Sequence, residues 1–214
     1  ENNANDPRRA EAYRRLLPVI VNGWRQDFGQ EFPFYIVQLA SYAKRGDGPA
    51  TSPWPVSLWS VLRESQAQVA ATLPKSGLAV AIDIGEPENI HPKNKQEVGR
   101  RLALVALANE YRQKIECSGP VLSKSQIEGT NIALTFTHAA GLSAKGGGAV
   151  TGFVIAGADG LFQPAAAEIQ GTTVRVSSPQ VSKPVAVRYA WAGSPECNLV
   201  NGAGLPASPF RTGK

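Results

Sequence analysis

Two histidines, His91 and His138, are the side chains of this sequence best suited to move a proton near neutral pH. His91 lies in a polar loop directly after Gly77–Ile84, an apolar run typical of a buried strand. Functional groups in open α/β sheets gather at the carboxyl ends of the strands, so His91 is a candidate general base there, with an ordinary loop residue as the alternative. His138 follows an expected strand and has no acid near it in the sequence. We interpret His138 as a surface histidine or one with a structural hydrogen bond.

A histidine base works best when an acceptor, usually a carboxylate, holds its second ring nitrogen. Three carboxylates precede His91, namely Asp83, Glu86 and Glu88. Glu88 lies three residues before the histidine and can reach the ring across one turn, so it is our candidate for the orienting acid. Asp83 and Glu86 remain alternatives, and so does a histidine that works with a serine alone. Asp83 can equally be a strand-end residue that binds loop amides.

The first half of the chain alternates helical and strand-like patterns. A helix is expected from residue 5 to 25, with Asp6 as its N-cap and Pro7 at its first position. Pro18 makes a kink or an early end of this helix possible. The alternation predicts an α/β fold with a parallel sheet flanked by helices. The other expected elements are strands at 32–39 and 77–84 and helices at 57–73 and 95–112, with a loop at 44–55.

The character of the sequence changes after Ser118-Gly119-Pro120. Short β-branched runs separated by glycine-rich turns are typical of antiparallel strands in a β-sandwich. We therefore predict two units, an α/β unit at 1–115 and a β-rich accessory unit at 116–214. The expected strands of the second unit are Ile132–Phe136, Thr151–Ile155, Thr172–Val176 and Val185–Tyr189.

Composition excludes several classes of function. The chain of 214 residues carries a net charge of +5, and its basic residues are scattered rather than clustered, which argues against nucleic-acid binding. No apolar run approaches the ~20 residues that a membrane span needs. Cys117 and Cys197 cannot form a zinc site by themselves, and we expect no metal or other cofactor. Whether they form a disulfide or stay free thiols is left open.

One stretch of sequence resembles a known family. The run Ile90-His91-Pro92-Lys93-Asn94-Lys95-Gln96, within 83–102, is similar to the region of the catalytic histidine in sialate O-acetylesterases, which are SGNH-type hydrolases. Supporting similarities occur at 32–39, 62–66 and 204–212. The resemblance implies an SGNH-type hydrolase fold, a serine carbohydrate esterase activity, and His91 as the catalytic base. The family commonly has aspartate three residues before this histidine, where the present chain has Glu88.

The resemblance also implies that this chain is the C-terminal portion of a longer protein. Glu1-Asn2-Asn3-Ala4 resembles the end of the family's Trp-Tyr-Gln-Gly-Glu-Ser-Asn-Ala block, and Asn2 or Asn3 is a candidate for the oxyanion site. The chain has no methionine and no signal peptide. No segment matches the family's Gly-Gln-Ser-Asn nucleophile, and Lys124–Ile127 lies in the wrong context. We expect an N-terminal chain or segment of the same precursor to carry the serine.

The resemblance implies an O-acetylated carbohydrate as substrate, with sialic acid as the first expectation, acetylated xylan as an alternative, and a secreted or periplasmic location. A non-catalytic carbohydrate-binding or assembly module and a purely structural subunit are the rival interpretations. Arg63 and Glu64 are expected to bond each other on a helix, although they are also candidates for lining the pocket. Trp54 and Trp59 are expected to be core residues rather than sugar platforms.

Overall fold

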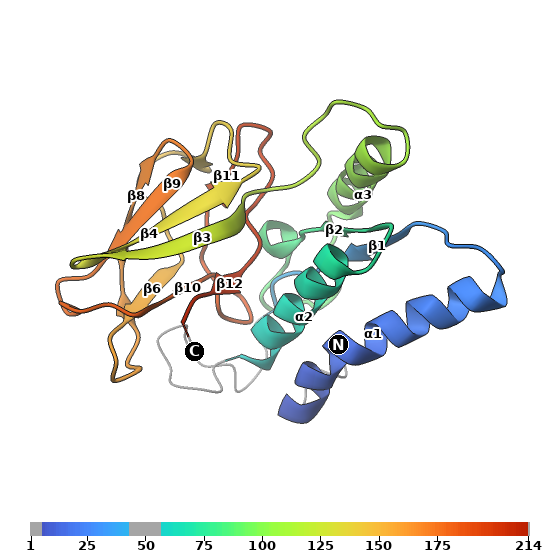
Figure 1. Ribbon diagram of the computed structural model, residues 1–214. Coiled ribbons are helices and arrows are strands. Elements are labelled where there is room, and N and C mark those ends of the chain that lie inside the picture. The colour runs from blue at the N-terminus through green and yellow to red at the C-terminus, as the bar shows by residue number, and fades with distance from the viewer. Residues whose placement is uncertain (1–5, 43–56, 214) are drawn as a thin grey trace.

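The computed structural model describes residues 6–42 and 57–213 (Figure 1). Helices and one parallel pair of strands occupy the first half of the chain, and antiparallel strands fill the second half. The helical half contains α1 (Pro7–Asp27), β1 (Phe34–Val37), α2 (Leu58–Thr72), β2 (Ser76–Ala79), the 3₁₀ helix η2 (Ile82–Ile84) and α3 (Lys95–Asn109). The β-rich half contains β3 (Val121–Glu128), β4 (Asn131–Thr137), β5 (Ser143–Ala144), β6 (Phe153–Ala156), β7 (Gln163–Pro164), β8 (Ala166–Gln170), β9 (Thr173–Ser177), β10 (Ala186–Tyr189), β11 (Leu199–Val200) and β12 (Phe210–Arg211).

Helix α1 begins where the sequence predicts. The Asp6 side chain accepts a hydrogen bond from the Arg8 backbone N–H at 2.8 Å, and Pro7 occupies the first turn. The helix continues through Pro18 to Asp27, so the early end that Pro18 made possible does not occur. Its buried residues Leu17 and Val21 pack against β1 and α2, and this tertiary packing stabilises the helix beyond the proline.

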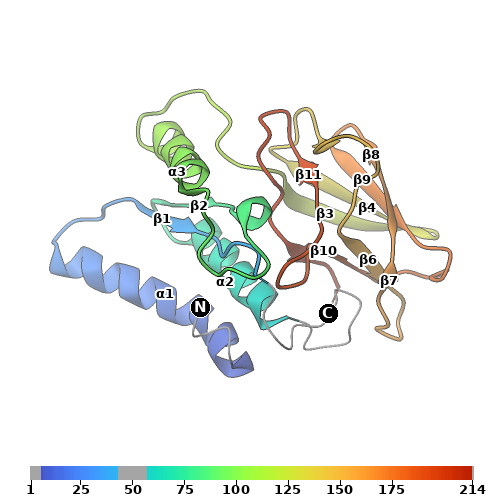
Figure 2. The same cartoon turned by 180° about the vertical axis from the view of Figure 1, so that it is seen from behind.

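Strands β1 and β2 form a parallel pair in which Phe34 lies opposite Ser76 and Val37 opposite Ala79. Helices α2 and α3 lie on opposite sides of this pair (Figures 1 and 2). The expected strand at 77–84 is wrong in its second half, because the chain leaves the sheet after Ala79 and forms η2. The Val80 and Ile82 carbonyls accept hydrogen bonds from the Arg101 and Ser41 side chains, which replace a strand partner. In the described part of the chain the other sheets are all antiparallel.

The β-rich half has two four-stranded antiparallel sheets, in the orders β3-β4-β9-β8 and β12-β10-β6-β7, and a small β5-β11 pair. Apolar side chains from both larger sheets meet in one core, because alternate residues of each strand point inward. All four strands expected from the sequence are present, with ends displaced by up to two residues. The inward-facing residues include Ile132, Leu134, Ile155, Val174 and Val187.

The two halves of the chain share packing. Val80 and Ile82, from the end of β2 and from η2, belong to the same core cluster as the β-rich strands. Arg63 on α2 is fully buried and donates hydrogen bonds to four backbone carbonyls, two after β1 and two after β10. The division into units at residues 1–115 and 116–214 stays a prediction.

The cysteines are both free thiols. Burial raises the pKa of Cys197 to about 11 and also raises the pKa of Cys117, so both thiols are protonated and weakly nucleophilic near neutral pH. Among the helices of the described residues, none is both long and apolar enough to cross a bilayer.

Candidate active site

The loop that carries His91 runs from Gly85 to Asn94, between η2 and α3. It starts at a close contact, because a Cβ on Gly85 would lie 2.2 Å from the Ser41 backbone nitrogen. Only glycine allows the loop to approach the chain after β1 so closely. At its other end, Asn94 caps α3 by accepting the Glu97 backbone N–H at 3.1 Å. Both ends of the loop are therefore held by ordered elements.

The middle of the loop is fixed by two polar side chains. The Glu86 carboxylate accepts the Lys93 backbone N–H at 3.0 Å and closes the loop on itself. The Asn89 side chain accepts the backbone N–H of His91, also at 3.0 Å. The hydrogen bond from the Lys93 backbone is the main cause of the lowered pKa of Glu86. Glu86 thus closes the loop. Its carboxylate binds the Lys93 backbone N–H and does not bind the His91 ring.

The His91 side chain is exposed, while its neighbours are anchored. Ile90 packs against Trp59, Leu62 and Tyr42, and Pro92 is buried. This arrangement holds the backbone on both sides of the histidine and leaves its ring toward solvent. Within residues 6–42 and 57–213, the ring makes no hydrogen bond to a carboxylate or a serine.

Asp83 is committed elsewhere. Its carboxylate receives hydrogen bonds from both terminal nitrogens of Arg101, at 2.6 and 3.0 Å, and from Lys145 at 3.0 Å. Burial alone would raise the pKa of Asp83, but the two cations outweigh burial and lower it. Lys145 follows β5, so this ion pair joins η2 to the β-rich half. Asp83 is a structural residue, but it binds the Arg101 and Lys145 side chains rather than the loop amides that the sequence interpretation considered.

Glu88 is the remaining acid. It lies in the turn of the loop with an exposed side chain. Over the described ranges its carboxylate forms no hydrogen bond or ion pair, unlike Asp83 and Glu86. Glu88 is therefore not bonded to the His91 ring in this structure, and no other group competes for it.

The Asp83 ion pairs predict how stability depends on pH. A carboxyl whose folded pKa is lowered stabilises the protein fully above its unfolded pKa of about 3.9, and this contribution is lost as the pH falls through the folded value. We expect the melting temperature to fall as the pH is lowered below about 4, and Asp83→Asn to reduce that dependence. Differential scanning calorimetry across this range measures it. Glu168→Gln, an exposed carboxylate on β8, is the matched control and should leave the slope unchanged.

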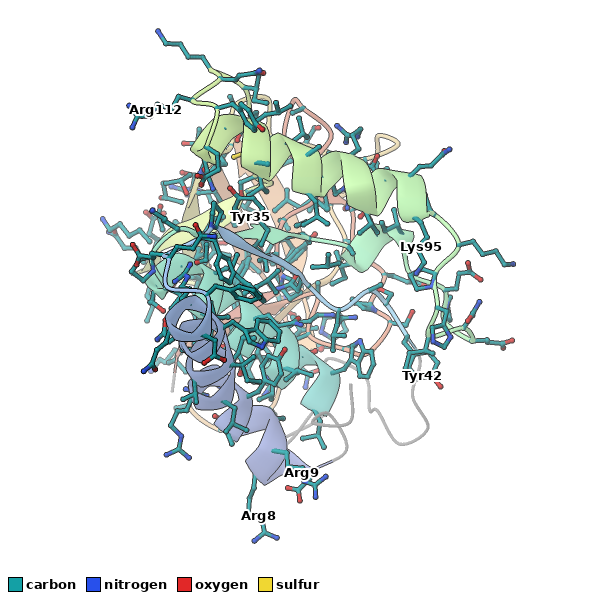
Figure 3. The ribbon with its side chains drawn as sticks, turned by 90° about the vertical axis from the view of Figure 1, so that its right-hand side faces the viewer. Arg8, Arg9, Tyr35, Tyr42, Lys95 and Arg112 are labelled. Atoms are coloured by element: carbon teal, nitrogen blue, oxygen red, sulfur yellow. The ribbon has the colours of Figure 1, made fainter. Side chains whose placement is uncertain are left out.

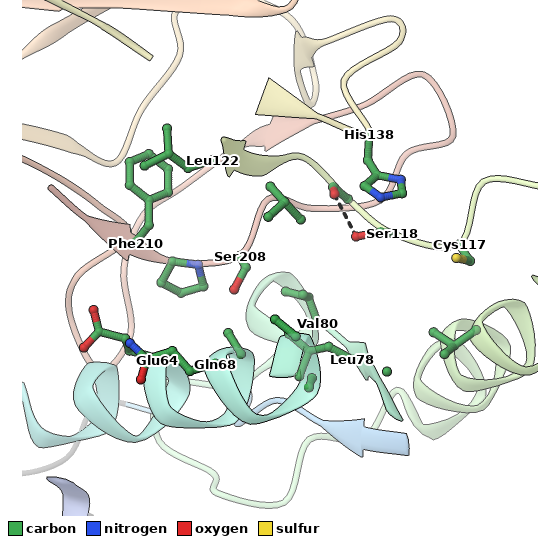
Figure 4. Close-up of a pocket in the computed structure, with 18 of the residues that line it drawn as sticks. Glu64, Gln68, Leu78, Val80, Cys117, Ser118, Leu122, His138, Ser208 and Phe210 are labelled. Carbon is green, nitrogen blue, oxygen red and sulfur yellow. Dashed lines mark hydrogen bonds between the residues drawn. The ribbon is translucent and has the colours of Figure 1, made fainter. Parts of the chain in front are cut away.

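A cavity of about 530 Å³ lies away from the His91 loop, between α2, β2, α3 and the β-rich half (Figure 4). His138 lies at its edge, and none of its lining residues comes from the Gly85–Asn94 loop. Its walls are mostly apolar, with Leu78, Val80 and Leu122 among them.

His138 has a carboxylate partner, which the sequence interpretation missed. Its Nδ1 lies 2.8 Å from Glu116 Oε1, and Glu116 also accepts the backbone N–H groups of Cys117 and Ser118. No acid lies near His138 in the sequence, since Glu116 is 22 residues earlier and only the fold brings it close. The expectation of a structurally bonded histidine is confirmed, since this pair fixes the segment between α3 and β3.

The other residues that the sequence marked have structural contacts. Arg63 and Glu64 do not bond each other. Arg63 binds backbone carbonyls, and Glu64 forms a bidentate ion pair with Arg211, whose Nε and Nη2 lie 3.0 and 2.8 Å from the two carboxylate oxygens. Trp59 is buried and donates its indole N–H to the Ala40 carbonyl at 2.9 Å, as expected of a core tryptophan. Lys124–Ile127 forms part of strand β3. Asn2, Asn3, Trp54 and the loop at 44–55 lie outside the described residues.

Comparison with known proteins identifies relatives. No protein-family model matches the chain. The chain is 32% identical over 151 residues to a rat (Rattus norvegicus) sialate O-acetylesterase, covering 64% of this chain and 27% of the relative. It is 27% identical over 223 residues to the sialate O-acetylesterase of Pongo abelii, covering 94% of this chain and 42% of the relative.

A solved structure gives the same result. The crystal structure of a carbohydrate acetylesterase from Xanthomonas citri superposes with a TM-score of 0.87 and 43% sequence identity, covering 96% of this chain and 46% of that one. The match therefore spans less than half the length of each of these three relatives. Curated names, sequence identity and fold agree that this chain is similar to sialate O-acetylesterases and to a carbohydrate acetylesterase.

Proposed function

We propose that this chain is part of a serine esterase that removes O-acetyl groups from carbohydrates, with His91 as the catalytic base. The observation that carries the proposal is the position of His91, in a loop anchored at both ends that follows the parallel strand β2. Functional groups collect at this edge of α/β sheets. The relatives named as sialate O-acetylesterases and carbohydrate acetylesterase support the reaction class.

The proposed reaction is acyl transfer through a serine on the upstream segment, defined as the polypeptide that precedes Glu1 in the precursor. The serine oxygen attacks the acetyl carbonyl carbon while His91 accepts the hydroxyl proton. The bond between carbonyl carbon and sugar oxygen breaks, and His91 returns the proton to that oxygen. His91 then accepts a proton from a water molecule as the water oxygen attacks the carbonyl carbon of the acetyl-serine. The bond between that carbon and the serine oxygen breaks, His91 returns the proton to the serine oxygen, and acetate leaves.

Glu88 is proposed as the acid that orients His91, because Asp83 and Glu86 are bound to other groups and Glu88 is not. We expect Glu88→Gln to lower kcat/KM for acetate release by about tenfold or more, since the amide cannot stabilise an imidazolium ion as the carboxylate does. Steady-state kinetics with the upstream segment present measures the effect. A change of less than about twofold would show that His91 works with the serine alone.

Two structural features belong to the same proposal. Strands β1 and β2 are proposed as members of the larger parallel sheet of an SGNH-type hydrolase unit ending near residue 115, with residues 116–214 as an accessory unit. The secreted or periplasmic location also stays a prediction.

Acetate release is the direct test of function. The chain combined with its upstream segment is incubated with 9-O-acetylated sialic acid and, separately, with acetylated xylan oligosaccharides. Faster release from the sialic acid supports a sialate esterase, and faster release from the xylan supports the xylan alternative. No release from either substrate by an intact, folded complex contradicts the esterase proposal.

A second candidate function rests on the cavity beside His138. Because its walls are mostly apolar and it lies apart from His91, it favours a non-catalytic binding or assembly role for the β-rich half. In that case ligand binding should be unaffected when His91 is replaced, and acetate release should be absent.

A further inference from the structure

Arg101 on α3 connects the two ends of the His91 loop. The residue is buried, with 4% of its surface exposed. Its terminal nitrogens donate to both carboxylate oxygens of Asp83, at 2.6 and 3.0 Å, and to the Val80 carbonyl at 2.6 Å. Its Nε donates to the Glu97 carboxylate at 2.8 Å. Val80 and Asp83 lie just before the loop and Glu97 lies just after it, so one side chain binds the segments on both sides of the loop.

The β-rich half joins the same network through Lys145. The Lys145 ammonium lies 3.0 Å from Oδ2 of Asp83, and its backbone N–H donates to the Asn198 carbonyl at 2.8 Å. This backbone bond extends the β5-β11 pair and fixes the base of the lysine. Figures 1 and 2 show η2, coloured green, between β2 and the β-rich half, and Ile82 of η2 packs in the core of that half. The start of the loop is therefore held by α3 and the β-rich half together.

A second contact from the β-rich half supports the middle of the loop. The Gly193 carbonyl, after β10, accepts the Tyr42 backbone N–H at 3.0 Å. Tyr42 packs in the same apolar cluster as the loop residue Ile90. In Figure 3, Tyr42 lies on the same side of the molecule as Lys95, which begins α3, and Arg112 lies on the opposite side. The β-rich half thus contacts both supports of the loop, η2 and the segment after β1.

The acids of this network are ionised near neutral pH. Hydrogen bonds from Arg100 and Arg101 lower the pKa of Glu97 to about 2. Burial raises the pKa of Asp83, but hydrogen bonds from Arg101 and Lys145 lower it by more. A guanidinium donates from several nitrogens in one fixed plane, so Arg101 sets the distance and angle between η2 and the first turn of α3. A lysine at this position would keep the charge and lose that geometry.

We propose that Arg101 is a positioning residue that holds the His91 loop in place for proton transfer, and that Lys145 makes the β-rich half part of this support. The inference rests on the proposed function. The side chain of His91 is exposed, so its position depends on the backbone on both sides of it. A base must lie within hydrogen-bond distance of the hydroxyl that it deprotonates, and a displacement of about 1 Å can cost about 10²-fold in rate.

The first test compares Arg101→Lys with Arg100→Lys in the chain combined with its upstream segment. Arg100 is the matched control, because it is the next residue on α3 and also binds Glu97, at 2.7 Å, while its contacts in the described structure stay on α3. Arg101→Lys should lower kcat for acetate release by about tenfold or more and change KM by less than about twofold, because the base is displaced and the substrate contacts remain. Arg100→Lys should keep kcat within about twofold.

Amide hydrogen exchange measured by NMR separates a local effect from a general loss of stability. The backbone N–H groups of His91 and Lys93 are bonded to side chains of the loop itself. Leu134, fully buried in the β-rich half, reports on the stability of the core. Arg101→Lys should speed exchange at His91 and Lys93 by about tenfold more than at Leu134, since opening of the loop is local.

Variants of Lys145 test the contribution of the β-rich half. Its side chain is 56% exposed, so Lys145→Met should fold, and it carries the test even where Arg101→Lys does not fold. Lys145→Met should lower kcat by about threefold or more, and Lys145→Arg, which keeps the ion pair with Asp83, should restore most of that loss. Lys124→Met is the matched control, an exposed lysine on β3, and should leave kcat unchanged.

The outcomes separate this inference from the proposed function. A wild-type protein that releases no acetate overturns the esterase, and faster local exchange of the loop in Arg101→Lys then still supports the positioning of the loop. An active protein in which Arg101→Lys folds and keeps kcat within about twofold overturns the positioning role. Equal acceleration of exchange in the loop and at Leu134 overturns it as well, because that pattern means a general loss of stability. Failure of Lys145→Arg to recover what Lys145→Met loses overturns the part assigned to the β-rich half.

Discussion

Replacing His91 with alanine should lower kcat/KM for acetate release by about 10²- to 10⁴-fold in the complex with the upstream segment. The reason is that the serine hydroxyl is a poor nucleophile unless a base removes its proton as the bond to carbon forms. Residual activity is expected from substrate binding and the oxyanion site. The side chain of His91 is exposed, so the variant should keep its fold and melting temperature.

His138→Ala is the matched control for this experiment. His138 is the second histidine of the chain and already has a carboxylate partner, Glu116, at 2.8 Å. If His91 is the base, His138→Ala should change kcat/KM by less than about threefold. The reverse pattern, with activity lost in His138→Ala and kept in His91→Ala, would move the active site to the cavity in Figure 4.

Replacing Arg63 with leucine should destabilise the protein by about 3 to 5 kcal/mol. Arg63 is fully buried and donates to the carbonyls of Leu39, Ala40, Ala192 and Gly193, at 2.7 to 2.8 Å. Leucine fills part of the space but leaves the Leu39 and Ala192 carbonyls without their donor, whereas the Ala40 and Gly193 carbonyls keep the Trp59 indole N–H and the Tyr42 backbone N–H. Each unsatisfied buried carbonyl costs about 1 to 3 kcal/mol. Chemical denaturation followed by circular dichroism measures the loss.

Two further variants make the Arg63 result specific. Arg63→Lys keeps the positive charge but lacks the planar fork that reaches several carbonyls at once, so it should recover only part of the stability. Arg9→Leu, an exposed arginine at the start of α1, should change the free energy of unfolding by less than about 0.5 kcal/mol. Equal losses for Arg63→Leu and Arg9→Leu would contradict a specific role for the buried guanidinium.

The contacts of the Gly85–Asn94 loop explain how it holds His91 in place. The Glu86 and Asn89 side chains accept hydrogen bonds from the loop backbone, and Asp83 links η2 to Arg101 of α3 and to Lys145. These three side chains therefore fix the position of the loop that carries His91, and none of them bonds its ring. The proposed orienting role falls to Glu88, because the contacts of the described residues engage Asp83 and Glu86 but leave Glu88 available.

Local sequence signals determined where several helices and strands of this protein lie. The Asp6-Pro7 start of α1, the Asn94 cap of α3 and the alternating strands of the β-rich half follow from short-range chemistry, and the structure contains each of them. The run around His91 carried the resemblance to sialate O-acetylesterases. These features depend on neighbours within a few residues, which a sequence displays directly.

Only the tertiary structure decided which groups meet. Pairing of His138 with Glu116, of Glu64 with Arg211 and of Asp83 with Lys145 joins residues 22 to 147 positions apart, and no periodicity encodes such contacts. The same holds for the early end of β2, since Arg101 and Ser41 take the carbonyls that a strand would use. Each buried polar group needs a hydrogen-bond partner, and the tertiary structure decides which distant side chain supplies it.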